Sequence, residues 1–372
     1  MERWRARARP RRRPHPALPP SPPGYYPEAL DKPNQDAVCA HEAFGGNPDC
    51  LLLACFDGHG NHGAGAATFV AEGMPAALLR DSLFKDAPEL ALRDAATATN
   101  TALHRSPIDD SLSGTTALLG LLRGGRLCVA NVGDSRAVAA VARPPPPLGF
   151  GGVAAVPLSW DHTPFRKDEY DRVKRAGARV LTLDQVEGLK DASAPCWKTE
   201  DDDAADPPRL WMPDALYPGT AFTRSVGDAA AERIGVIADP EVRVRDLGPD
   251  DRFVILATDG VWEFINNQEA VDLVASIGDP QRAAVELTFR AYERWLANET
   301  RTDDITAIVL KLDGAPAAAS LAKQSATAAS IAAATAACAE AAGAGGGLAR
   351  DSVREARASA ELATVAEARA AA

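Results

Sequence analysis

The sequence lacks the features that mark several common classes of protein. No apolar run approaches the roughly 20 consecutive residues that a membrane-spanning helix needs, so we expect no contact with a membrane. The six cysteines form no Cys-x-x-Cys pair, which disfavours a zinc site or a disulfide scaffold and suits a reducing compartment such as the cytoplasm. No Gly-x-Ser-x-Gly motif offers a nucleophilic serine. With 46% hydrophobic and 24% charged residues, the chain has the composition of a globular protein.

The charge is unevenly distributed along the 372 residues. The net charge is −11, yet the first 13 residues carry seven arginines and one glutamate, so the rest of the chain is more acidic than the total. An acidic body disfavours nucleic acid as the main partner and suits a protein that gathers cations. Only the arginine-rich start would support a nucleic-acid-binding role.

Composition divides the chain into three zones. Residues 1–23 are rich in Arg and Pro, and we interpret them as a disordered, solvated tail rather than a nuclear-localisation patch or an atypical transit peptide. Residues 315–372 contain 27 alanines among 58 residues and predict a low-complexity, frayed helical tail with little to bury. The expected folded unit is therefore 24–314.

Within that unit, strand and helix patterns alternate. The strand patterns are 51–56, 115–122, 127–132, 137–141, 253–257 and 305–312. The helical patterns are 64–79, 87–103, 167–176, 269–277 and 283–297, and Gly177 stands where a helix ends. Neighbouring strands such as 127–132 and 137–141 read as a hairpin. They predict antiparallel sheets covered by helices, an α+β protein.

Aspartates stand beside the ends of five of the apolar segments: Asp36, Asp57, Asp134, Asp259 and Asp303. Each of them alone is typical of a tight turn. Together, carboxylates at strand ends can converge on one point and bind hard divalent cations such as Mg²⁺ or Mn²⁺. A pair of such ions can activate a water for attack at phosphorus.

Seven short segments then follow one another in a recognisable order. They are 56–60 (FDGHG), 113–117 (SGTTA), 130–136 (ANVGDSR), 161–164 (DHTP), 222–228 (FTRSVGD), 257–262 (ATDGVW) and 302–306 (TDDIT). This series resembles the motifs of the metal-dependent type 2C protein Ser/Thr phosphatases. The resemblance implies a four-layer α-β-β-α sandwich of two antiparallel sheets flanked by helices. It also implies a monomeric enzyme that hydrolyses phosphoserine and phosphothreonine by metal-activated water.

The resemblance assigns roles to individual residues. Asp57 matches the residue that bridges two Mg²⁺ or Mn²⁺ ions. The other positions matched to metal ligands are Asp36 (through water), the Gly58 carbonyl, Asp259, Asp303 and, for a weaker third ion, Asp134. His59 matches the general acid that protonates the leaving seryl or threonyl oxygen. The plainer alternative for His59 is a hydrogen bond within its own loop.

Three positions depart from the pattern of that family. Gln35 stands where Glu is frequent, and Glu263 where Asp is usual at the third-metal site. The phosphate-binding Arg of the family falls on Asp31, so the adjacent Lys32 is the candidate for contacting the substrate phosphate, as a point charge.

Two further segments bear on substrates and partners. Residues 181–218 match the variable flap beside the active site, and their acidic run 200–203 predicts a preference for basic phosphosites. Residues 24–32 and 206–211 resemble the phosphatase module that plants and algae fuse to cyclic-nucleotide-binding and kinase domains, which implies such a partner. The alternative function is a pseudophosphatase that acts as a regulatory binding module. The retained carboxylates favour the enzyme.

Overall fold

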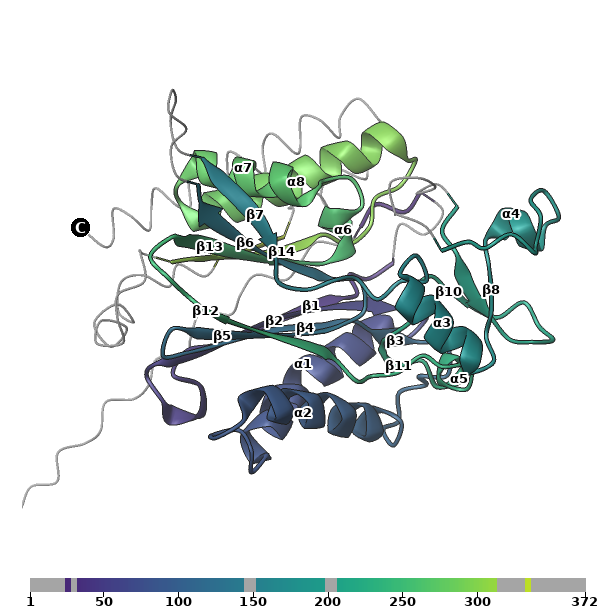
Figure 1. Cartoon of the computed structure of the whole chain (residues 1–372), viewed down its shortest axis with the longest axis horizontal. Helices are drawn as coiled ribbons and strands as arrows, with labels where there is room; N and C mark the ends of the chain where they lie inside the picture. Colours follow the sequence, from purple (N-terminus) through teal and green to yellow (C-terminus); the bar gives the residue numbers. More distant parts are fainter. Residues whose placement is uncertain (1–23, 28–31, 144–151, 198–205, 313–331, 336–372) are drawn as a thin grey trace, which may run out of the picture.

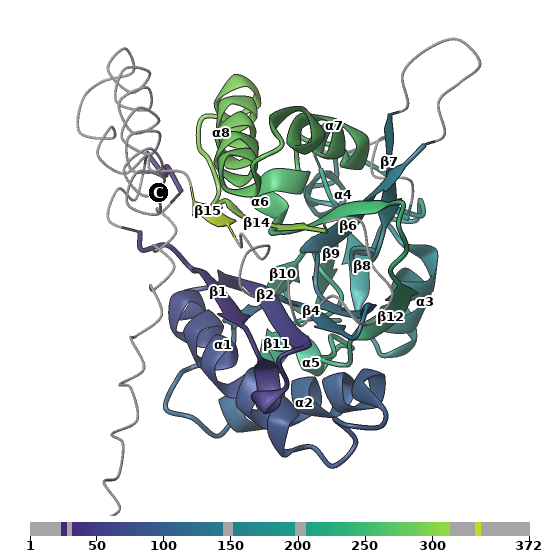
Figure 2. The same cartoon turned by 90° about the vertical axis from the view of Figure 1, so that its left-hand side faces the viewer.

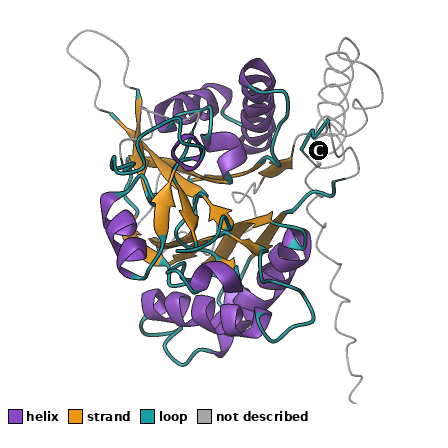
Figure 3. Ribbon diagram, turned by 90° about the vertical axis from the view of Figure 1, so that its right-hand side faces the viewer, coloured by secondary structure: helices purple, strands orange, loops and turns teal. Residues whose placement is uncertain are grey.

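Two antiparallel sheets face each other, and helices cover the outer face of each (Figures 1 and 3). The computed structural model describes residues 24–27, 32–143, 152–197, 206–312 and 332–335. The layers run α-β-β-α, which confirms the α+β sandwich expected from the sequence. The tail at 1–23 and all but four residues of the tail at 315–372 lie outside the described residues. Within the described ranges, no helix has the length and apolar character needed to cross a membrane.

The first sheet has seven strands, which come from both halves of the fold. Its order is β11-β3-β2-β4-β5-β12, with β1 paired to β2. The strands are β1 (Asp36–His41), β2 (Cys50–His59), β3 (Gly114–Thr115), β4 (Ala117–Arg123), β5 (Arg126–Val132), β11 (Val226–Gly227) and β12 (Glu241–Asp246). A 3₁₀ turn, η1 (Phe44–Gly46), joins β1 to β2.

The second sheet has five strands in the order β15-β14-β13-β6-β7. They are β6 (Arg136–Ala142), β7 (Val153–Pro157), β13 (Asp251–Ala257), β14 (Thr306–Lys311) and β15 (Ala332–Thr335). A separate small sheet, β10-β9-β8, stands at one end of the sandwich (Figure 1) and contains β8 (Arg179–Leu181), β9 (Arg209–Trp211) and β10 (Pro218–Thr220). Its strand β9 lies within the segment expected to form a flap, 181–218, and β8 and β10 lie at the two ends of that segment.

The helices divide between the layers as their positions in the sequence suggest. The first sheet is covered by α1 (Gly63–Arg80) and α2 (Pro88–Leu103), and the second by α6 (Asp259–Trp262), α7 (Asn267–Ile277) and α8 (Pro280–Asn298). Near the small sheet lie α3 (Lys167–Arg175), α4 (Leu183–Val186) and α5 (Ala229–Glu232). Asn266 caps α7 in a capping box with Glu269, which explains why that helix begins two residues before the predicted start.

Strand β2 shows why the predicted apolar runs do not alternate with polar residues. Leu52, Ala54 and Phe56 pack against the helices, whereas Leu53 and Cys55 pack into the space between the sheets. Because both faces of β2 are covered, the residues on both faces are apolar, and apolar and polar residues do not alternate along the strand. Strand β2 is thus a central strand, and its last residues reach the end of the sandwich.

Two expectations from the sequence are wrong. Strands β5 and β6 do not form a hairpin: β5 pairs with β4 and β12, while β6 pairs with β13 and β7 in the other sheet. Gly133, with a φ of 104°, lies in the link that carries the chain across. A short link between two apolar strands is compatible both with a hairpin and with a crossing to the other sheet, so the sequence does not distinguish them. Likewise, Ala332–Thr335 form a strand beside β14 rather than a helix, because the edge of that sheet offers backbone partners.

Candidate active site

The predicted carboxylates come together where the two sheets end. Asp36 begins β1 and lies directly opposite Asp57 on β2. Asp259 begins α6 immediately after β13, and Asp303 lies in the loop that enters β14. Because β14 lies against β2 across the sandwich (Figure 2), strand ends from both sheets supply side chains to one point.

The pKa values of Asp57 and Asp36 reflect how closely the charges gather. Burial raises the pKa of Asp57, and the nearby charges of Asp259, Asp36 and Asp303 raise it further. The pKa of Asp36 is raised by burial and by Asp304. These carboxylates are half-buried and repel one another, so positive charge nearby favours their ionised forms.

Asp259 connects this cluster to a second group of acids. Burial raises its pKa, followed by the charges of Asp134 and Asp303 and, more weakly, that of Glu263. Asp134 and Glu263, the two positions matched to a third-metal site, therefore both lie near Asp259. The structure brings together all of the predicted carboxylates.

The hydrogen bonding of the cluster fits a hard cation. Among the described residues, the Oδ1 atoms of Asp36 and Asp259 are buried and have no hydrogen-bond donor. The other oxygen of Asp36 accepts a bond of 3.2 Å from Thr258 Oγ1. Buried oxygens are nearly always paired, so unpaired carboxylate oxygens facing other carboxylates suit ligands of Mg²⁺ or Mn²⁺.

Gly58 owes its place to close backbone packing. A Cβ atom there would lie 2.4 Å from the carbonyl oxygen of Gly63 and 2.6 Å from that of Gln35. Its N–H donates to the Gln35 carbonyl at 3.1 Å. Only glycine fits between these segments, and the approach brings the end of β2 close to the loop before β1.

His59 is held by a residue far away in the sequence. Its Nε2 lies 2.6 Å from Oδ2 of Asp228, which is buried and has a φ of 54°. Burial favours the neutral imidazole, but the charge and hydrogen bond of Asp228, together with Asp134, outweigh it and raise the pKa of His59. The alternative of a bond within its own loop is therefore wrong. No signal in the sequence linked Asp228 to His59.

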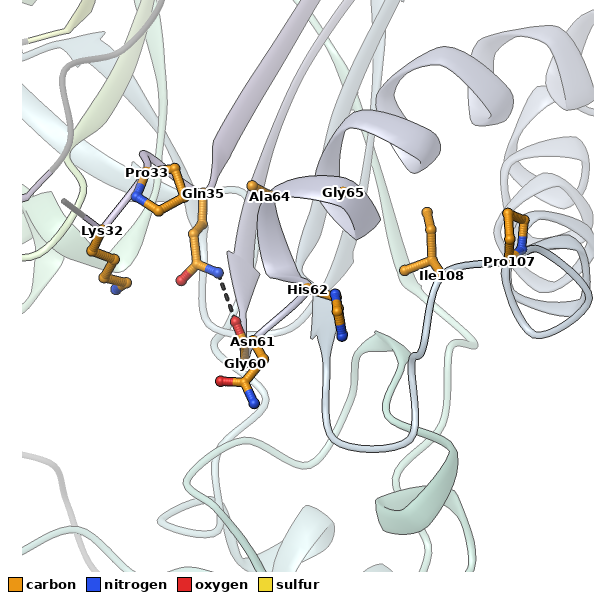
Figure 4. A pocket seen from close by; sticks show the side chains of 10 residues that line it. All are labelled: Lys32, Pro33, Gln35, Gly60, Asn61, His62, Ala64, Gly65, Pro107 and Ile108. Carbon is orange, nitrogen blue, oxygen red and sulfur yellow. Dashed lines mark hydrogen bonds between the residues drawn. The ribbon is translucent and has the colours of Figure 1, made fainter. Parts of the chain in front are cut away.

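Lys32 lies at the edge of a cavity beside the loop that follows β2. The cavity measures about 520 Å³ and is also lined by Gln35, Gly60 and His62 (Figure 4). Gln35 Nε2 donates to the Gly60 carbonyl at 2.7 Å. The Lys32 ammonium stands 3.7 Å from the ring centre of Tyr26. Asp31 lies outside the described residues.

A second acidic cluster, formed by Asp168, Glu169 and Glu241, has ligand atoms within 4.8 Å of one another. Its charge is already balanced by three arginines: Arg166, Arg172 and Arg224. Although burial opposes ionisation of Glu169, hydrogen bonds from Arg224 and Arg172 hold its pKa well below the usual range. We interpret this cluster as an ion-pair network that braces α3, because guanidinium groups occupy the positions a cation would need.

Comparisons with known proteins agree with this geometry. Residues 29–300 match the family described as Protein phosphatase 2C. The chain is 47% identical over 289 residues to "Probable protein phosphatase 2C 35" of Arabidopsis thaliana, covering 78% of this chain and 81% of that protein. It is 36% identical to "Probable protein phosphatase 2C 64" of Oryza sativa subsp. japonica, covering 76% and 63%. The serine-threonine phosphatase 2C of Toxoplasma gondii shares the fold, with a TM-score of 0.62 at 21% identity over 79% of this chain and 98% of that one.

Proposed function

Since the chain belongs to the protein phosphatase 2C family, we propose how its own residues carry out the reaction of a metal-dependent protein serine/threonine phosphatase. The observation that carries the proposal is the half-buried carboxylate cluster at the ends of β1, β2, β13 and β14. Its unpaired oxygens and mutual repulsion support a role for these acids in binding divalent cations. A pseudophosphatase is not favoured, because the acids are all present and gathered at one point.

We propose that two Mg²⁺ or Mn²⁺ ions are held by Asp57, Asp259, Asp303 and the Gly58 carbonyl, with Asp36 acting through water. Asp134, with Glu263 nearby, is the candidate for a weaker third ion. When bound, such ions lower the pKa of water and offset the charge that develops at phosphorus. The carboxylates would determine where the ions lie relative to the phosphorus atom, because they are attached to the strand ends of a rigid sandwich.

His59 is proposed to donate its proton to the seryl or threonyl oxygen that leaves. Asp228 supports this role because it favours the protonated imidazole and holds the ring. Lys32 is proposed to contact the substrate phosphate as a point charge. Its place at the cavity beside Gly60 supports that contact.

Substrates and partners are proposed on charge and resemblance. We propose phosphoproteins as substrates, with basic phosphosites preferred because of the acidic run 200–203, which lies outside the described residues. Matched basic and acidic phosphopeptides test this preference, and equal rates of hydrolysis would contradict it.

The resemblance of 24–32 and 206–211 to fused phosphatase modules supports a kinase or cyclic-nucleotide-binding partner. We propose a monomer located in the cytoplasm, or in the nucleus if the arginine-rich start directs it there.

Phosphate release from a phosphothreonine peptide tests the function. Activity should require Mn²⁺ or Mg²⁺ and disappear in EDTA, and Asp57→Asn should lose about 100-fold or more, as expected when a site for charge stabilisation is removed. Asp86→Asn, an exposed acid outside the cluster, serves as the matched control and should retain full activity. Release that persists in EDTA, or in Asp57→Asn, would contradict the proposed function.

A further inference from the structure

We propose that Tyr26 is a positioning residue for Asp303. Tyr26 belongs to residues 24–26, a segment that we call the strap. This inference rests on the proposed function, because it concerns a proposed metal ligand. The strap precedes β1 in the sequence, yet it lies along the 302–304 loop, more than 270 residues away. The sequence singled out residues 24–32 only for their resemblance to fused phosphatase modules and gave Tyr26 no role.

The backbone of the strap follows the ligand loop closely. Thr302 N donates to the Tyr25 carbonyl at 2.9 Å, and Tyr25 N donates to Thr302 Oγ1 at 2.7 Å. Gly24 N donates to Oδ1 of Asp304, whose other oxygen accepts from Gln35 N at 2.9 Å. Asp304 therefore ties the strap to the residue before β1. The loop that carries Asp303 is bound on one side by the strap.

The side chain of Tyr26 reaches the proposed ligand itself. Its hydroxyl donates to Asp303 Oδ1 at 2.6 Å, and Asp304 N donates to the same oxygen at 2.8 Å. Two donors on Oδ1 restrict rotation of the carboxylate and leave Oδ2 as the oxygen for a cation. Hydrogen bonds of this kind orient metal-binding carboxylates. Tyr26 is 9% exposed, so water competes little for the bond.

The ring of Tyr26 has a second contact that can be separated from the first. The Lys32 ammonium stands 3.7 Å from the ring centre, a cation–π contact. The hydroxyl thus contacts a proposed metal ligand, and the ring supports the lysine proposed to contact phosphate. Replacement by Phe removes the first contact and keeps the second, whereas replacement by Leu removes both.

Calorimetric titration of the metal-free protein with Mn²⁺ tests the proposal without relying on catalysis. Tyr26→Phe should weaken binding by about 10-fold to 100-fold, the usual effect of removing a hydrogen bond from a ligand. Tyr25→Phe is the matched control. It deletes a neighbouring hydroxyl that makes no described hydrogen bond, so it should bind Mn²⁺ like the unmodified protein. At saturating Mn²⁺, Tyr26→Leu should in addition raise KM for a phosphopeptide, while Tyr26→Phe should not.

Melting temperatures separate positioning from a merely structural role. The rise in Tm between EDTA and excess Mn²⁺ should be smaller for Tyr26→Phe than for Tyr25→Phe, because the stabilisation depends on metal affinity. If Tyr26→Phe lowers Tm equally with and without Mn²⁺ and binds the ion normally, the proposal is overturned.

Gly24→Ala gives an independent check, since its Cβ would lie 2.6 Å from the Asp303 carbonyl carbon and displace the strap. Gly24→Ala should also weaken Mn²⁺ binding. An unchanged Mn²⁺ affinity of this variant would contradict the proposal that the strap positions Asp303. The affinity is measurable even if no peptide is hydrolysed.

Discussion

The contact between His59 and Asp228 gives the clearest prediction for a single residue. Asp228→Asn removes the charge that favours protonated His59 and should lower kcat on a phosphothreonine peptide by about 10-fold, equivalent to 1.4 kcal/mol of barrier. Hydrolysis of p-nitrophenyl phosphate should change much less, because its leaving group needs no proton. Steady-state kinetics on both substrates measures the ratio. An equal loss on both would contradict the proposed proton donor.

Glu169 gives a prediction about stability. Its buried carboxylate accepts hydrogen bonds from Arg172, Arg224 and Thr223. Glu169→Gln leaves these guanidinium groups without their anion and should lower the free energy of unfolding by about 3–5 kcal/mol. Asp171→Asn, which breaks an exposed pair with Lys167 on the same helix, should cost less than about 0.5 kcal/mol. Urea denaturation at pH 7 distinguishes the two. A similar loss for both variants would refute a special role of the buried network.

The same carboxylate predicts how stability depends on pH. Because the pKa of Glu169 is lower in the folded protein than its usual value of 4.5, its ionisation stabilises the fold above that pH. This contribution is lost as the pH falls below 4.5 toward the folded pKa. Glu169→Gln should therefore flatten the acid side of the stability curve, measured by denaturation between about pH 3 and pH 6. An unchanged slope would show that other acids determine it.

At the scale of elements, helix α1 contains glycines in two different surroundings. A Cβ at Gly73 would make an ordinary contact of 3.7 Å with Thr99, so Gly73→Ala should stabilise the protein by about 0.5–1 kcal/mol through helix propensity. A Cβ at Gly63 would lie 2.7 Å from the Gly58 carbonyl carbon, so Gly63→Ala should destabilise it despite the same propensity. Thermal unfolding measures both. Equal effects would mean that packing at the end of β2 is looser than described.

Element boundaries show where reasoning from the sequence succeeds and fails. The long, strongly patterned helices α1, α2 and α8 begin and end within three residues of their predicted bounds, because hydrophobic periodicity is a local signal. Which sheet receives β6 depends on partners that are distant in the sequence, and the short link at Gly133 carries no such information. The short strands β8, β9 and β10 were not predicted as strands, because three residues give too few alternations to detect.

At the scale of the whole molecule, the sandwich turns scattered aspartates into one cluster. The motifs predicted which acids belong together, since Asp36, Asp57, Asp259 and Asp303 all flank apolar strands. They did not predict how Asp228 reaches His59 or how Tyr26 reaches Asp303. The first contact joins β2 to the residue after β11 within one sheet, and the second joins the strap to the loop before β14. The partners are 169 and 277 residues apart, and their sequence spacing carries no trace of the contacts.

Anomalous diffraction from crystals of the protein grown with Mn²⁺ locates the bound ions and so tests the assignment of the active site. We expect two strong peaks among Asp36, Asp57, Asp259 and Asp303, with any third and weaker peak near Asp134. We expect no peak at Asp168, Glu169 and Glu241, where arginines already balance the charge. Peaks at that second cluster, or none at the first under saturating Mn²⁺, would contradict the assignment of the active site.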